Sequence, residues 1–126
     1  MALLDDIGTA LTDAGVVSSG WSLFKSFSPD APDQCITVYE TGGVAPAQTP
    51  GLGAQWPSFQ VRVRGKRLEY DVARTKLQAV HDALNNATVS GYVYVYVAHS
   101  GVFPLGHDEK QRPLIVMNFD TMKAGA

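Results

Sequence analysis

Residues 59–66, with the sequence FQVRVRGK, alternate strictly between apolar and polar side chains. Successive side chains of a β-strand point to opposite faces, so this period predicts a strand with one apolar face and one basic face. The apolar residues are Phe59, Val61 and Val63, and the basic residues are Arg62, Arg64 and Lys66. We therefore expect a sheet whose apolar face is covered by other elements, with these three charges on the opposite face.

Two segments have the apolar spacing of amphipathic helices that would cover such a sheet. Near the start of the chain, Leu4, Ile7, Leu11 and Ala14 recur at helical intervals, and Gly15 follows as a stop signal. The second segment spans residues 70–84. Its apolar stripe consists of Tyr70, Ala73, Leu77, Val80 and Leu84.

Further strands are predicted by runs of β-branched and aromatic residues at 34–40, 91–98 and 113–119. Residues 21–27 suggest a short or irregular extended piece, and Gly42 and Gly43 are expected to end the strand that starts at residue 34. The order of elements predicts an α+β fold. We expect a mostly antiparallel four- to five-stranded sheet with two helices packed on one face, forming a single domain over residues 1–126.

Composition limits the possible partners. The chain has 126 residues, and 10 basic against 12 acidic residues give a net charge of -2. There is thus no general attraction to nucleic acid or to an anionic membrane, and any basic surface must be local. The single cysteine, Cys35, forms no internal disulfide, and no run reaches the roughly 20 apolar residues that a transmembrane helix needs. We expect a soluble, intracellular protein.

No group of residues predicts a catalytic or metal site. His99, His107, Asp108 and Glu109 are the only cluster of possible metal ligands, and their spacing matches no standard zinc pattern. Asp108 and Glu109 fit the polar tip of a hairpin better than a pair of catalytic carboxylates. Cys35 lies inside a predicted strand and is interpreted as an inert thiol. We expect no catalytic residues, no metal and no cofactor.

Three features are candidates for interaction surfaces. In the tract YVYVYV, the valines can face the helices, which leaves Tyr92, Tyr94 and Tyr96 in a row on the other face. Such a row is either covered by the protein's own loops or forms a protein–protein interface. The basic strand is a solvated face, a nucleic-acid surface, a surface for another protein or the lining of a channel. Residues 42–55 carry no charge, and with Leu52 and Trp56 this loop either orders against a partner or is an ordinary surface loop.

Three segments carry a resemblance to a known family. Residues 29–43 read PDAPDQCITVYETGG, residues 57–86 read PSFQVRVRGKRLEYDVARTKLQAVHDALNN, and residues 104–119 read PLGHDEKQRPLIVMNF. In this order they resemble the bacteriophage minor capsid family, the tail terminator or tail completion proteins of long-tailed phages. The resemblance spans residues 29–120, and the first helix and the region around Trp21 are less diagnostic.

The resemblance implies a virion structural protein without enzymatic activity. Members of the family form a ring, usually hexameric, that caps the tail tube, stops its polymerisation and joins the tail to the connector of the head. The implied partners are further copies of the chain, the tail tube protein and the head-tail connector protein, with DNA only in passage and no membrane. The implied location is the head-proximal end of the tail in the virion, and the host cytoplasm during assembly.

In such a ring, Arg62, Arg64 and Lys66 would form a basic band that faces a partner or the lumen, because each charge repeats around the axis. The tyrosine row would form the subunit interface, and the loop with Leu52 and Trp56 would contact the tube. Two other interpretations stay open. One is a small non-catalytic module that binds a ligand or peptide, and the other is an enzyme that uses His99, His107 and Asp108.

Overall fold

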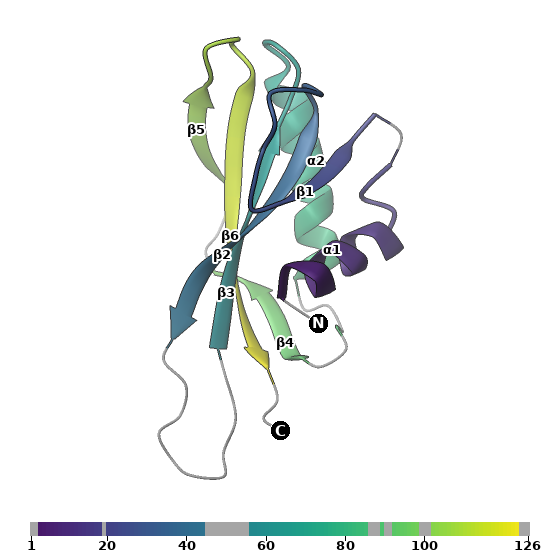
Figure 1. The fold of residues 1–126 in the computed structure, drawn as a ribbon, viewed down its shortest axis with the longest axis vertical. Helices are drawn as coiled ribbons and strands as arrows, with labels where there is room; N and C mark the ends of the chain where they lie inside the picture. Colours follow the sequence, from purple (N-terminus) through teal and green to yellow (C-terminus); the bar gives the residue numbers. More distant parts are fainter. Residues whose placement is uncertain are drawn as a thin grey trace.

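The computed structural model describes residues 3–18, 20–44, 56–85, 89, 92–98 and 102–123. These residues form two helices, α1 (Leu3–Asp13) and α2 (Tyr70–Leu84), and six strands. The strands are β1 (Ser22–Lys25), β2 (Cys35–Val44), β3 (Trp56–Arg64), β4 (Tyr92–Val97), β5 (Phe103–His107) and β6 (Pro113–Lys123). Figure 1 shows both helices on one side of a long, twisted sheet. The predicted α+β class is confirmed.

The sheet has more strands than predicted, and its strands are not all antiparallel. The order is β1-β2-β3-β6-β4, and β5 also pairs with β6. Because β4 pairs with the second half of β6 and β5 with its first half, both lie along the same edge of the sheet. β1 pairs with β2 in parallel. The prediction of four to five mostly antiparallel strands is therefore corrected to a six-stranded mixed sheet.

The helices bury most of the apolar stripes that their spacing predicts, but Ala14 is exposed because α1 ends at Asp13. In α1 the side chains of Leu4, Ile7 and Leu11 are buried, and the helix is followed by Gly15 with a φ of +79°. In α2 the buried residues are Ala73, Leu77, Val80 and Leu84. Tyr70, which we expected in the stripe, is exposed because it is the first residue of the helix.

The register of the three central strands explains why the alternation in β3 was informative. Val63 lies between Ile36 of β2 and Ile115 of β6, and the next inward position aligns Val38, Val61 and Met117. One step further, the rings of Phe59 and Phe119 stack with centroids 5.1 Å apart. All of these side chains belong to the core that the helices cover. The predicted apolar face of β3 is thus the centre of the core.

β4 does not have the alternation that its sequence predicts. Its pairing with β6 shifts register between Tyr92 and Tyr94, so Val93 is an extra residue in a bulge. The bulge turns Tyr92 to the helix side, where it packs against the core, and leaves Val93 59% exposed. The predictions that Val93 faces the helices and that three tyrosines share one face are therefore wrong.

β2 is longer than predicted and passes through the glycine pair to Val44. A register shift between Glu40 and Gly42 marks a bulge, and Gly42 has a φ of +92°, which favours glycine at this position. The strand continues because Gly43 and Val44 still pair with the first residues of β3. Residues 45–55, including Leu52, lie outside the described residues.

Candidate interaction surfaces

The outer face of the sheet, opposite the helices, carries the alternate residues of β3. Arg62 is half-buried on this face, and its guanidinium carbon lies 5.0 Å from the ring centroid of Tyr39 on β2. One guanidinium nitrogen, Nη2, donates a hydrogen bond to Gln60 Oε1 at 3.4 Å. The Nε of Arg62 is buried, whereas the residue as a whole has intermediate exposure. Arg62 is therefore partly accessible on the outer face.

Arg64 is not a surface residue. Only 6% of it is exposed, because residues 26–33 fold across this end of the outer face. Its Nε donates to the carbonyl of Asp33 at 3.0 Å, and its Nη2 donates to the carbonyls of Pro29 and Pro32 at 2.7 and 2.6 Å. The prediction that Arg64 belongs to an exposed basic band is wrong. The alternation placed it on the correct face, but a loop covers that face here.

A second buried arginine, Arg112, which lies just before β6, also binds the loop of residues 26–33. Its Nε donates to Asp108 Oδ2 at 2.7 Å, and its Nη2 and Nη1 reach Asp30 Oδ1 and Asp33 Oδ1 at 3.0 and 3.1 Å. Lys110 also pairs with Asp30. The sequence analysis missed this network, although its residues lie in two of the segments that carry the family resemblance. The recurrence of Asp in PDAPD and of basic residues in DEKQR was the available signal.

Asp108 organises the turn between β5 and β6, as the hairpin prediction requires. Its Oδ1 accepts hydrogen bonds from the backbone amides of Lys110 and Arg112, both at 2.9 Å. Burial opposes ionisation, but the hydrogen bonds from the backbone and side chain of Arg112 outweigh it and lower the pKa of Asp108. Asp108 is therefore a structural carboxylate. His107 is exposed on β5, and His99 lies outside the described residues.

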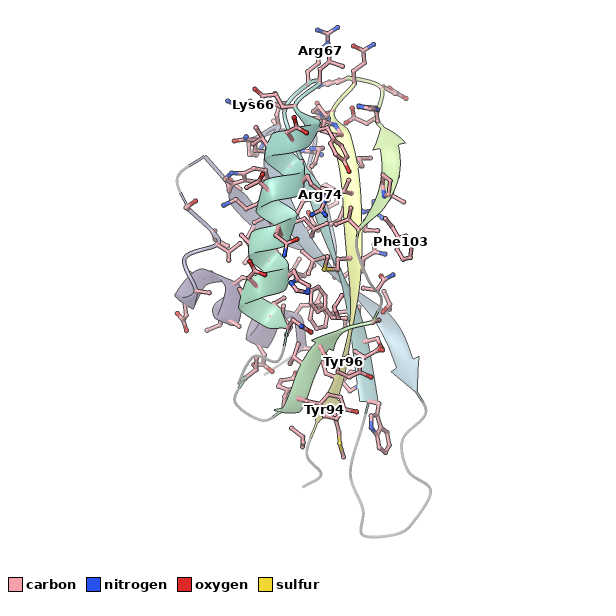
Figure 2. All side chains as sticks on the ribbon, turned by 180° about the vertical axis from the view of Figure 1, so that it is seen from behind. Lys66, Arg67, Arg74, Tyr94, Tyr96 and Phe103 are labelled. Atoms are coloured by element: carbon pink, nitrogen blue, oxygen red, sulfur yellow. The ribbon has the colours of Figure 1, made fainter. Side chains whose placement is uncertain are left out.

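The third residue of the predicted basic band, Lys66, lies beyond β3 in the turn that leads to α2. It is fully on the surface, next to Arg67, at the end of the molecule where β3 ends (Figure 2). The three predicted charges thus have three different environments: half-buried on the sheet, buried under a loop, and exposed at one end. They do not form one continuous band within a subunit.

The tyrosines of β4 also divide into two groups. Tyr92 donates a hydrogen bond from its hydroxyl to Asp6 Oδ2 of α1 at 3.0 Å, and burial together with this carboxylate raises the pKa of Tyr92. Tyr94 and Tyr96 remain together near the end of the sheet (Figure 2), with ring centroids 5.1 Å apart. Tyr96 is 39% exposed. The described part of the candidate tube contact, Trp56, is half-buried at the start of β3.

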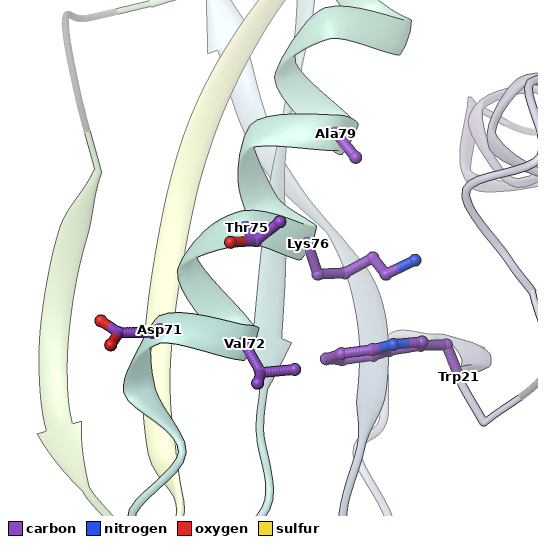
Figure 3. A pocket seen from close by; sticks show the side chains of 6 residues that line it. All are labelled: Trp21, Asp71, Val72, Thr75, Lys76 and Ala79. Carbon is purple, nitrogen blue, oxygen red and sulfur yellow. The ribbon is translucent and has the colours of Figure 1, made fainter.

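A shallow hollow that the sequence did not reveal lies beside α2. Figure 3 shows the indole of Trp21 facing Val72 and Lys76 of the helix across this hollow, whose volume is about 400 Å³. Lys76 Nζ lies 5.2 Å from the centroid of the indole and donates to the carbonyl of Val16 at 3.0 Å. Burial lowers the pKa of Lys76. The hollow is mostly apolar and open to the surface.

Within the described residues, no three histidine, cysteine or acidic side chains come together in a way that would hold a metal ion. In the same part of the chain, neither helix is long and apolar enough to cross a membrane. Over the described residues, the geometry offers a sheet-and-helix unit with unpaired strand edges, a partly exposed aromatic pair and exposed charges at one end. These features define an α+β protein whose candidate sites are surfaces for other macromolecules.

The comparisons with known proteins agree with this class. Residues 10–123 match the family described as bacteriophage tail terminator protein, and the chain belongs to that family. A chain in the solved structure titled "Virion of native gene transfer agent (GTA) particle" has a similar fold, with a TM-score of 0.76 and 18% sequence identity. The similarity covers 98% of this chain and 96% of that one. No curated protein matches the sequence. The predicted family is thus confirmed, and with it a structural role in the phage tail.

Proposed function

We propose that this protein forms a ring, hexameric in the assembled tail, which caps the tail tube, ends its polymerisation and provides the surface that joins tail to head. Membership of the tail terminator family is the observation that carries this proposal. The similar fold of a chain from a gene transfer agent virion supports a place in a particle of this kind. The role is structural and needs no catalytic residue or cofactor. The protein assembles in the host cytoplasm and stays at the head-proximal end of the tail.

The two sheet edges suggest how a ring would close. Within the described residues, β1 pairs only with β2 on one edge, and β4 and β5 pair only with β6 on the other (Figure 1). An open edge leaves backbone donors and acceptors available to another chain. When two different surfaces of identical subunits join head to tail, the contact repeats, and it forms a ring where the rotation between neighbours closes. Tyr94 and Tyr96 lie on β4, so we assign the subunit interface to that edge, with Tyr92 acting inside the subunit.

The remaining surfaces are assigned to the other partners. Trp56, with Leu52 of the preceding connection, contacts the tail tube from the end of the sheet where β3 starts. Arg62 and Lys66 face a partner or the lumen, through which DNA passes without being bound specifically. Arg64 has no place in this assignment because it is buried.

Negative-stain electron microscopy of the purified protein, with and without purified tail tubes, tests the proposal. We expect rings on the tube ends, and Tyr96→Glu should abolish them because it adds a charge to the interface. Tyr70→Glu is the matched control, since Tyr70 is 38% exposed but lies on α2, away from both sheet edges. Bare tube ends with the wild-type protein would refute the capping role. Rings that persist with Tyr96→Glu would instead refute the assignment of the interface to β4.

A ligand- or peptide-binding module is the second candidate, and the hollow at Trp21 is the observation that favours it. In that case a Trp56→Phe variant, which leaves Trp21 as the only tryptophan, should change its fluorescence when an aromatic peptide is titrated. Saturable binding by this variant without any association with tail tubes would favour the module. Association with tubes and no response of Trp21 would favour the terminator.

A further inference from the structure

The turn between β3 and α2 holds a leucine in a conformation that disfavours it. Leu68 has a φ of +61°, the left-handed region that residues other than Gly, Asn and Asp seldom occupy. Its side chain is 62% exposed, so packing within the subunit does not compensate for the strain. The backbone reason for the conformation is clear, since the Leu68 amide donates to the carbonyl of Gln111 at 3.0 Å. Glycine would make the same hydrogen bond without strain.

The surrounding structure fixes this turn firmly. The Gly65 amide donates to the carbonyl of Pro113 at 3.1 Å, and the Glu69 amide donates to the carbonyl of Lys66 at 3.0 Å. Gly65 also lies so close to α2 that an added Cβ would meet the Cβ of Ala73 at 3.0 Å. The partner turn, which supplies Gln111, is itself held by Arg112 and its carboxylates. Leu68 is thus displayed on a rigid support, and strain that persists in this way is often related to function.

The residues before Leu68 supply positive charge. Lys66 and Arg67 are exposed, and their side chains form no hydrogen bond or ion pair with any residue that the structure describes. The acidic residues that follow, Glu69 and Asp71, lie at the start of α2, where they offset the positive end of the helix dipole. Of the charged residues in this turn, Lys66 and Arg67 are therefore the ones available to a partner. Figure 2 shows both at the extreme end of the molecule.

We propose that Leu68, with Lys66 and Arg67, is a docking knob that inserts into an apolar recess rimmed by carboxylates on the head-side partner of the ring. This inference rests on the proposed function and adds the residues and the chemistry of the contact. β3 has nine residues and is about 26 Å long, and the knob lies just beyond its end opposite Trp56. Because Trp56 is assigned to the tail tube, the opposite end faces the head. A leucine in a recess excludes water, and the two cations that precede it pair with the rim.

The test has two arms. A phage lacking this gene is complemented with the wild-type protein or each variant during infection, which gives tail length, and heads and tails purified from the uncomplemented phage are mixed with the purified protein, which gives joining. Leu68→Gly removes the side chain and the strain together, and Leu68→Asn keeps a residue that tolerates this conformation but is polar. The matched control is Ser26→Gly. Ser26 has a φ of +62°, is exposed and donates its amide to the carbonyl of Val38, but it lies at the end of β1, outside the knob. Electron microscopy then gives the fraction of tails joined to heads and the tail length.

We expect both Leu68 variants to melt within about 3 °C of wild type and to cap tails at normal length, while joining falls at least about tenfold. Ser26→Gly should cap and join normally, and Lys66→Glu with Arg67→Glu should reduce joining most at low salt. Normal joining by Leu68→Gly would overturn the knob and leave the proposed function intact. Loss of both capping and joining by folded Leu68→Gly would place the knob on the tail side and overturn the inference. If the wild-type protein neither caps nor joins, the proposed function itself fails.

Discussion

Arg64 offers the clearest quantitative prediction, because its environment differs so much from the exposed position that its sequence context suggests. Replacing Arg64 with methionine keeps much of the apolar stem but removes the guanidinium and its hydrogen bonds to the carbonyls of Pro29, Pro32 and Asp33. A hydrogen bond to a charged group contributes roughly 1.5 to 3 kcal/mol. The freed carbonyls lie near the surface and regain water in part, so the three bonds together are worth less than their sum. We expect Arg64→Met to lower the free energy of unfolding by about 3 kcal/mol.

For a domain of this size, that change lowers the melting temperature by about 10 °C. Thermal unfolding followed by circular dichroism measures it, and Lys66→Met is the matched control because it removes an exposed charge two residues away. The control should stay within about 0.5 kcal/mol of wild type. Arg64→Lys should fall between the two, since an ammonium cannot reproduce the planar fork of the guanidinium. Equal melting temperatures for Arg64→Met and Lys66→Met would refute the anchoring role.

Three further predictions follow from the buried polar groups. The pKa of Asp108 is lowered in the folded state, so the stability that its ionised form contributes is present above the unfolded pKa of about 3.9 and is lost as the pH falls through the folded pKa. Asp108→Asn should therefore flatten the acid limb of a curve of unfolding free energy against pH. An unchanged acid limb would contradict this prediction. Tyr92→Phe should cost about 1 kcal/mol in urea denaturation, because Asp6 loses its hydroxyl partner; a neutral result would show that the bond is not formed in solution. Cys35 is buried and burial raises its pKa, so a thiol reagent should label it only in denaturant; rapid labelling under native conditions would mean that the loop over it opens.

The elements that the sequence predicted well are those in which one period extends over the whole segment. β3 alternates without interruption through Phe59, Val61 and Val63, and both neighbouring strands present matching apolar residues in register. The stripes of α1 and α2 are equally regular. In each case the buried face follows from side-chain direction alone, so the α+β class and the position of the helices on one face were predictable.

The parts that were not predictable depend on contacts between distant segments. The bulge at Val93 reverses the orientation of Tyr92, although the tract YVYVYV alternates perfectly, because the pairing with β6 decides the register. β5 contains Pro104 and Gly106, which are poor strand residues, and exists because β6 offers a free edge. Arg64 is buried by residues about thirty positions earlier, and no local pattern shows such a cover.

The contacts of the buried arginines show which part of the molecule the family resemblance describes. Two of the segments that carry it, residues 29–43 and 104–119, meet in space, where Arg112 links Asp30 and Asp33 of the first to Asp108 of the second. Arg64, which lies in the remaining segment (residues 57–86), donates hydrogen bonds to backbone carbonyls of residues 29–43. These residues satisfy one another, so their similarity to the family reflects how this end of the domain is built. The side chains of Lys66, Arg67 and Leu68, which we propose to contact a head-side partner, are exposed and stand on this framework without contributing to it. Changes in the framework should therefore reduce stability first and assembly only as a consequence, whereas changes in the exposed residues should reduce assembly while stability stays constant.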